Sequence, residues 1–169
     1  SINSFVNTIQ DFIVIEPTGV QQTIRGSFQV WEYRQTDAQL LGFDWDVSYL
    51  FAKNFRFIHQ FSFLKGYDRI EDEALIDMPP VNTQNEIVYQ NPELKGLRIS
   101  IQSNYVFRQN EYPNNNFEVY IPETGTTELV DLSTPPDAYH LLNFSSSITL
   151  RSTNKSKFTV GLDITNMMN

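Results

Sequence analysis

The residues between Leu41 and Tyr49 alternate strictly between large apolar side chains and small or charged ones. The odd positions are Leu41, Phe43, Trp45, Val47 and Tyr49, and the even positions between them are Gly42, Asp44, Asp46 and Ser48. A period of two residues is typical of a β-strand, because successive side chains point to opposite faces of a sheet. This segment is therefore predicted to be a strand with one apolar face and one polar face.

A second strand with the same character follows at once. Residues 51–54 interrupt the alternation, and the next segment has Phe55, Phe57, Phe61 and Phe63 on one side and Arg56, Gln60 and Ser62 on the other. Two such strands joined by a short polar turn are predicted to form a hairpin. Its aromatic face fits either the core of a soluble β-sandwich or the lipid-facing side of a membrane barrel with a wet, charged lumen.

Composition narrows the class of protein. The chain has 169 residues, enough for a sizeable core, and no apolar run approaches the roughly 18 residues that a spanning helix needs. Strands of a membrane barrel place only alternate residues on lipid, so a barrel remains possible. The net charge of −8 argues against a nucleic-acid partner, and the absence of cysteine excludes disulfides and thiolate metal sites.

The same reasoning along the chain predicts seven strands and no helix. The expected strands are residues 1–15, 41–49, 55–63, 78–89, 97–108, 142–150 and 158–165. Short turns are expected at residues 51–54, 91–96 and 152–157, and long irregular segments at residues 17–32, 67–77 and 111–137. Outer-membrane barrels alternate short and long connections in this way, although a sandwich can do so by chance.

Several stretches resemble TonB-dependent outer-membrane receptors. Residues 33–38 (Tyr-Arg-Gln-Thr-Asp-Ala), continuing through Leu40, Gly42, Phe43 and Asp44, resemble a strand near the end of those receptors. Met78-Pro79-Pro80 resembles the proline pair that opens a later strand, and residues 161–169 resemble the next-to-last strand, which ends in an Asn-x-x-Asn pattern. The order and spacing of these motifs agree with those of the receptor family along nearly the whole chain.

The resemblance implies an all-β fold: about seven strands of a larger antiparallel up-and-down transmembrane β-barrel, present as an open curved sheet and one domain over residues 1–169. The family has a plug domain, a TonB-contacting segment and about 22 strands. We therefore expect a C-terminal part of the barrel without the plug and the final strand.

By the same resemblance, the chain is expected in the bacterial outer membrane, as barrel wall and extracellular loops of a receptor that imports a scarce nutrient. An iron–siderophore complex, a cobalamin, a glycan or a peptide all remain open as the nutrient. The expected partners are outer-membrane lipid, TonB acting through the absent plug, and this small ligand. A soluble β-sandwich ligand-binding module is the alternative, and an outer-membrane hydrolase is less favoured.

Candidate lumen-facing residues come from the polar sides of the predicted strands. Asp44 and Asp46 lie two apart, so they could hold a cation together, but a wet wall whose carboxylates balance arginines is the simpler interpretation. The predicted lumen-facing set is Arg34, Asp44, Asp46, Arg56, Arg98 and Arg108.

An acidic loop provides candidate ligand contacts. Its residues Asp68, Glu71, Asp72 and Glu73 could attract a cationic or metal-bearing ligand through their field, although such runs are often simply solvated.

Neither histidine supports a catalytic or metal site. His59 lies on the same face of its strand as the phenylalanines, and Ser62 lies on the opposite face. The two side chains therefore cannot form part of a catalytic triad on this strand. His140 has no second ligand at a suitable spacing. We expect no enzymatic activity, no metal site and no cofactor.

Overall fold

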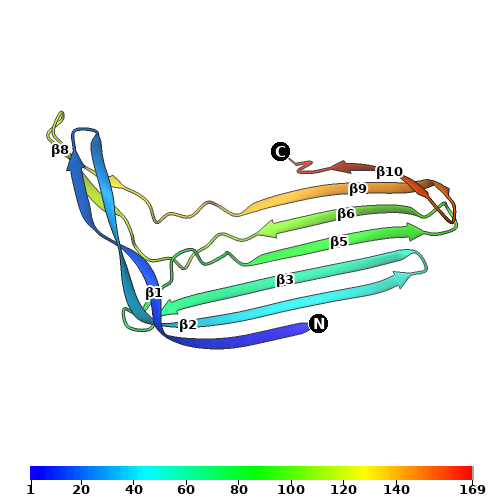
Figure 1. The fold of residues 1–169 in the computed structure, drawn as a ribbon, viewed down its shortest axis with the longest axis horizontal. Coiled ribbons are helices and arrows are strands. Elements are labelled where there is room, and N and C mark those ends of the chain that lie inside the picture. The colour runs from blue at the N-terminus through cyan, green and yellow to red at the C-terminus, as the bar shows by residue number, and fades with distance from the viewer. Residues whose placement is uncertain (169) are drawn as a thin grey trace.

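The computed structural model describes residues 1–168, which form an open, curved antiparallel sheet with an arm rising from one end (Figure 1). The order of the long strands in the sheet is β1-β2-β3-β5-β6-β9-β10. Their bounds are β1 (Ile2–Thr23), β2 (Gly26–Ala52), β3 (Phe55–Asp68), β5 (Asn82–Asn91), β6 (Leu97–Val106), β9 (Tyr139–Ser152) and β10 (Lys157–Ile164). The two-residue strand β4 (Glu73–Ala74) pairs with β3. Within residues 1–168 there is no helix long and apolar enough to cross a membrane.

Cross-strand register gives the sheet two continuous faces. One row of what we call the apolar face consists of Tyr49, Phe57, Ile87, Ile101, Phe144 and Ile164. A row of the opposite side, the polar face, consists of Asp46, Gln60, Gln84 and Asn104. Residues directly opposite each other on paired strands share a face, so alternation in each strand becomes a two-sided sheet.

The sheet is open, as expected. β1 and β10 lie at opposite edges and do not pair with each other, and the two chain ends are apart in Figure 1. The predicted fold class, an antiparallel all-β open curved sheet, is confirmed.

The turns after β2, β5 and β9 lie at one end of the strands and the connections after β3 and β6 lie at the other, as predicted, but the connection between β1 and β2 is a two-residue turn rather than a long segment. Residues 53–54, 92–96 and 153–156 form the short-turn end, at the right of Figure 1. The connections after β3 and β6 leave from the other end, here called the long-loop end.

The prediction of an irregular segment at residues 17–32 was wrong. β1 continues through Pro17, which pairs with Trp31 of β2, and the two strands turn at residues 24–25 to form the arm. Proline lacks a backbone donor, but β1 is an edge strand of the described sheet, so no ladder bond on its outer side is lost. A register shift between Pro17 and Gly19 accommodates the ring.

The irregular segments predicted at residues 111–137 and 67–77 were also partly wrong. The first contains a separate hairpin, β7 (Phe117–Ile121) with β8 (Thr126–Val130), which reaches the arm where Gln22 Nε2 donates to the carbonyl of Tyr120 at 3.2 Å. In the second, β3 extends to Asp68 and β4 pairs beside it. Prolines and asparagines in the flanking sequence hid these short strands, whose pairing is stabilised by contacts with distant segments.

Two further boundaries differ from the prediction: β5 begins at Asn82 rather than at Met78, and β6 ends before the predicted Arg108. β6 ends at Val106, so Arg108 lies in the following loop. At the other end of the chain, Asn166 donates its backbone N–H to Asn143 Oδ1 at 3.0 Å, which ties the segment after β10 to β9. Asn169, the second asparagine of the predicted pattern, lies outside the described residues.

Candidate functional site

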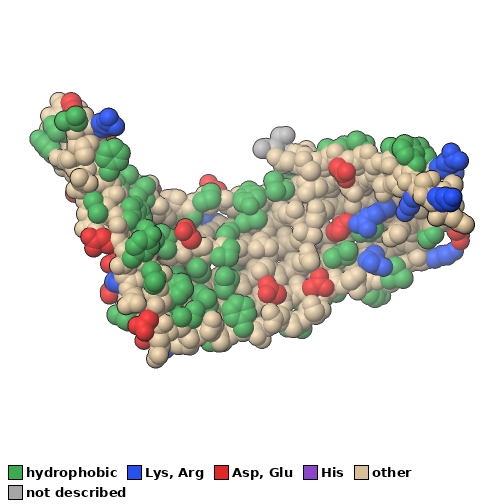
Figure 2. Space-filling view, in the orientation of Figure 1, with side chains coloured by type: hydrophobic (Ala, Val, Ile, Leu, Met, Phe, Trp, Pro, Cys, Tyr) green, Lys and Arg blue, Asp and Glu red, His purple; other side chains and the backbone are tan. Residues whose placement is uncertain are grey.

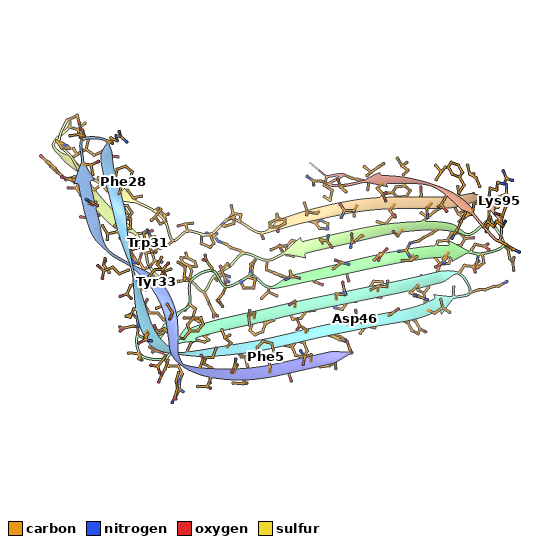
Figure 3. All side chains as sticks on the ribbon, in the orientation of Figure 1. Phe5, Phe28, Trp31, Tyr33, Asp46 and Lys95 are labelled. Atoms are coloured by element: carbon orange, nitrogen blue, oxygen red, sulfur yellow. The ribbon has the colours of Figure 1, made fainter. Side chains whose placement is uncertain are left out.

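The polar face carries the two aspartates of the starting hairpin. Ser62 Oγ donates to Asp44 Oδ1 at 2.7 Å, and Gln60 Nε2 donates to Asp46 Oδ2 at 3.3 Å; Asp46 is marked in Figure 3. The strand register places both carboxylates on one face of the sheet and Trp45 on the other, as expected from the alternation. Their partners are neutral residues of β3, and within residues 1–168 neither forms an ion pair with an arginine.

The four arginines of the predicted lumen-facing set lie at three different places. Arg56 and Arg98 line a hollow of about 410 Å³ on the polar face near the short-turn end, where Arg98 pairs with Glu86 at 3.0 Å. Arg34 lies at the long-loop end, and Arg108 pairs with Asp137 between two loop segments at 3.3 Å. The structure therefore brings together Arg56 and Arg98 but separates them from Arg34 and Arg108.

Charge is segregated along the strands. Figure 2 shows Lys and Arg side chains gathered at the right-hand end, which is the short-turn end. The basic residues at this end are Lys53, Arg56, Lys95, Arg98, Arg151, Lys155 and Lys157, and Glu93 is the acidic residue of its turns. The long-loop end has most of the acidic residues, so the two ends of the strands carry charge of opposite sign.

Asp68 is held at the end of β3 by donors from three segments. Its side chain accepts hydrogen bonds from Thr36 Oγ1, from Arg34 Nη2 at 2.8 Å and from the backbone N–H groups of Ile70 and Glu71 at 2.9 and 3.1 Å. Burial raises the pKa of this carboxyl, but the hydrogen bonds from Thr36 and Arg34 outweigh burial and lower the pKa to about 2. Asp68 is 4% exposed and organises the loop that follows it.

The remaining acidic residues of that loop have a different environment. Glu71, Asp72 and Glu73 are exposed at the long-loop end. Sequence reasoning grouped Asp68 with them, because the donors on β2 are more than 30 residues away and no local pattern reveals them. Contact of the four carboxylates with a ligand stays a prediction.

The same loop folds back onto the polar face. Leu75 packs against buried Val14 and Ala38, with Met78 beside them. Gly66 lies beneath this contact, since a Cβ there would fall 2.6 Å from Met78 Sδ and 2.9 Å from Leu75 Cδ1. The absence of a side chain at Gly66 thus lets the loop approach the sheet.

A salt bridge not anticipated from the sequence links β3 to the loop after β6. Lys65 Nζ binds Glu111, and Tyr67 Oη donates to Glu111 Oε2 at 2.8 Å. The hydrogen bond from Lys65 lowers the pKa of Glu111. The sequence offered one indication of this salt bridge: Lys65 lies between Phe63 and Tyr67 at positions that share one face of the strand, where the other side chains are aromatic.

Each histidine has a neutral partner on a neighbouring strand of the apolar face. His59 Nδ1 donates to Asn85 Oδ1 at 2.8 Å, and His140 Nε2 hydrogen-bonds Ser103 Oγ at 2.7 Å. The Trp45 ring meets His59 edge-on, with 5.4 Å between ring centroids. Such pairs satisfy half-buried polar groups among apolar neighbours. Across residues 1–168, no three His, Asp or Glu side chains cluster closely enough to hold a metal.

Comparisons with known proteins give a likeness of fold. No protein-family profile and no curated protein sequence matches the chain. A solved structure, the copper transporter OprC, is similar with a TM-score of 0.71 at 16% sequence identity. The match covers 98% of this chain and 22% of that chain, so this chain spans about a fifth of the transporter's length. The sheet therefore has the fold of part of that transporter.

Proposed function

We propose that the chain forms part of the wall and extracellular loops of a bacterial outer-membrane transporter that imports a small, scarce nutrient. The likeness of fold to part of a β-barrel transporter supports the architecture. The transport role rests on this likeness together with the resemblance of the sequence to TonB-dependent receptors.

One observation carries the membrane assignment: a broad apolar face that is exposed rather than packed. Tyr49, Ile87, Ile101 and Ile164 of its central row are all exposed. A contiguous apolar surface of this kind is rare on a soluble monomer, whereas it is the expected outer surface of a membrane barrel.

The strands are long enough for this role. Roughly 9–11 tilted residues cross a bilayer, and β3, β5, β6 and β9 have 14, 10, 10 and 14 residues. Counted from Phe55, such a crossing ends before Tyr67, so Asp68 and its loop lie outside the membrane.

The polar face then lines the water-filled lumen. Asp44, Asp46, Arg56 and Arg98 contribute its charge, Arg34 and Arg108 lie toward the exterior, and the short turns face the periplasm. The exposed carboxylates after Asp68 are proposed to meet the nutrient from outside. Uptake is proposed to be driven by TonB through a plug domain supplied outside these residues.

The proposed cargo is a small nutrient such as an iron–siderophore complex. Copper belongs to the name of the similar transporter, and we do not carry it over at 16% identity. We propose no catalytic step and no cofactor. The alternative of a soluble β-sandwich needs a second sheet over the apolar face, and the other sheet of the described residues is the small β7–β8 hairpin beside the arm.

Site-specific fluorescence tests the membrane assignment. Residues 1–169 contain no cysteine, so in a full-length protein cleared of any cysteine outside them, Ile101→Cys and Gln102→Cys each place one environment-sensitive label, on the apolar and the polar face respectively. In vesicles containing the full-length protein, brominated lipid is expected to quench the label at residue 101, and aqueous iodide the label at residue 102. Equal quenching of both labels by iodide would contradict the proposal. Uptake of the nutrient by cells then tests transport separately.

A further inference from the structure

The short-turn end carries exposed basic side chains directly beyond the apolar face. We call Lys95, Arg151 and Lys155 the basic rim, and all three are exposed. Thr149 N donates to the carbonyl of Lys95 at 3.0 Å, which places the turn between β5 and β6 beside the end of β9. Lys95 is marked at this end of the sheet in Figure 3. The basic rim therefore combines one strand end with two neighbouring turns.

Strand register places Arg151 on the apolar face. Arg151 is the ladder partner of Phe158, which continues the apolar alternation of Val160 and Ile164 in β10. Residues that lie opposite each other on paired strands share a face. A register shift between Phe158 and Thr159 produces this arrangement. An arginine at the end of an apolar face keeps its stem on the apolar surface and extends its charge past the edge of that surface.

Aromatic side chains mark the edge of the apolar face next to the basic rim. Phe55 and Tyr89 are ladder partners whose ring centroids lie 4.9 Å apart. Phe158, near the start of β10, is 58% exposed. Aromatic residues form girdles at the two interfaces of a membrane barrel. In the proposed membrane arrangement, the basic rim therefore lies at the level of the lipid headgroups.

Neighbouring carboxylates do not neutralise the basic rim. Within residues 1–168, none of its three members forms an ion pair. Glu93, the acidic residue of these turns, pairs with Lys53 at 3.6 Å. The sequence as a whole has a net charge of −8, so composition does not account for positive charge at this end. The free charges of the basic rim attract a partner that carries negative charge.

We propose that the basic rim binds the phosphate groups of anionic phospholipids, such as phosphatidylglycerol, in the leaflet that the short turns face. Lysine and arginine beside an anionic membrane surface attract its headgroups, and a guanidinium forms paired hydrogen bonds with phosphate oxygens. Lipid fits better than an acidic protein, because Arg151 shares its face with apolar side chains that acyl chains cover. This inference rests on the membrane assignment of the proposed function and adds a lipid class and a binding site.

Quenching by brominated lipids tests the inference. The full-length protein, cleared of any cysteine outside residues 1–169, carries one fluorescent label at Leu150→Cys, an exposed position beside Arg151. The vesicles contain phosphatidylcholine and phosphatidylglycerol in equal parts, with either lipid brominated. The ratio of the two quenching efficiencies measures which lipid gathers at the label. Phosphatidylglycerol is expected to be enriched about threefold, and less so in concentrated salt.

Charge variants of the labelled protein test the basic rim itself. The triple variant Lys95→Gln, Arg151→Gln and Lys155→Gln is expected to lower the enrichment to about one. Arg151→Lys, which keeps the charge, is expected to retain most of it. Lys157→Gln is the matched control, because Lys157 is an exposed lysine beside the same turn but alternates with Phe158 and so lies on the polar face. This control is expected to leave the enrichment nearly unchanged.

Three results would each overturn the inference: equal quenching by the two lipids, unchanged enrichment in the triple variant, or an equal loss in Lys157→Gln. Equal quenching together with binding of soluble polyglutamate that the triple variant loses would assign the basic rim to an acidic protein instead. A label that neither brominated lipid quenches would remove the membrane assignment and the proposed function with it. Equal quenching by both lipids keeps the label in the membrane and removes the headgroup inference alone.

Discussion

The ring of Phe5 lies directly over Gly42 of the neighbouring strand. A Cβ built on Gly42 would fall 2.1 Å from Phe5 Cε1, and the two residues are partners in the β1–β2 ladder. An aromatic side chain packed over a cross-strand glycine covers the exposed backbone that the glycine leaves. This pair accounts for the position of a phenylalanine on the polar face.

Gly42→Ala is expected to destabilise the folded protein by roughly 1 kcal/mol, because the new methyl group displaces the Phe5 ring. In a Phe5→Ala background the same change is expected to be nearly neutral. Urea titrations of the four proteins in a double-mutant cycle measure the coupling. Gly19→Ala is the control, since a Cβ at Gly19 meets nothing within 4 Å. Purely additive effects of the two substitutions would contradict the contact.

An arginine introduced on the apolar face is expected to destabilise the protein more than one introduced on the polar face. Val47→Arg, on the apolar face, is expected to destabilise the folded protein in vesicles by roughly 2–4 kcal/mol if Val47 lies near the bilayer midplane. Ser48→Arg, the neighbouring position on the polar face, is expected to cost less than about 1 kcal/mol. Denaturant titration in lipid vesicles measures both values. Similar losses for the two variants would argue for water on both faces.

The two ends of the strands are expected to lie on opposite sides of the membrane. Glu123 is exposed between β7 and β8, and Lys95 is exposed in the turn between β5 and β6. Labelling of intact cells with an impermeant maleimide is expected to modify Glu123→Cys and to spare Lys95→Cys. Both variants should react after the outer membrane is permeabilised. Modification of Lys95→Cys alone in intact cells would reverse the orientation.

Asp68 is expected to make the long-loop end sensitive to acid. Its folded-state pKa of about 2 lies below the ordinary value of 3.8, so the ionised carboxylate contributes stability above about pH 4 and this contribution disappears as the pH falls toward 2. The contribution is about 2 kcal/mol at neutral pH. Hydrogen exchange of residues 69–78, measured from pH 5 to pH 2.5 and corrected for intrinsic rates, is expected to show loss of protection.

Asp68→Asn is expected to remove most of this pH dependence. Asp72→Asn, which changes an exposed carboxylate of the same loop, is expected to retain it. Identical pH profiles for the wild type and Asp68→Asn would show that other groups control the loop.

Residues 1–169 produced alone in water are expected to associate. The sheet has unpaired edges at β1 and β10 and an exposed apolar face, and both features promote association. Light scattering during size-exclusion chromatography, with and without detergent, measures this. A stable monomer in water with a cooperative thermal transition would contradict the interpretation.

The strands of the main sheet apart from the arm, their two faces and the placement of the connections after β2, β3, β5, β6 and β9 could be read from the amino-acid order. These features depend on local patterns: a period of two residues sorts Trp45 from Asp44 and Asp46, and turn residues mark the strand ends. The polar positions of the candidate site followed from the same periodicity. Their partners did not, because Asp44 and Asp46 bond to neutral residues of β3 rather than to the expected arginines.

Long-range pairing decided the rest. Pro17 reads as a strand breaker, yet it lies within β1 because an edge position removes the cost of its missing donor. Asp68 reads as one of several loop acids, yet Thr36 and Arg34, on a strand more than 30 residues earlier, surround it and lower its pKa. The cavity of about 510 Å³ at the long-loop end likewise combines Trp31 with Tyr112, from segments that are distant in the chain. Local periodicity carries no information about which distant segments meet, since cross-strand contacts and loop packing arise only when the whole sheet assembles.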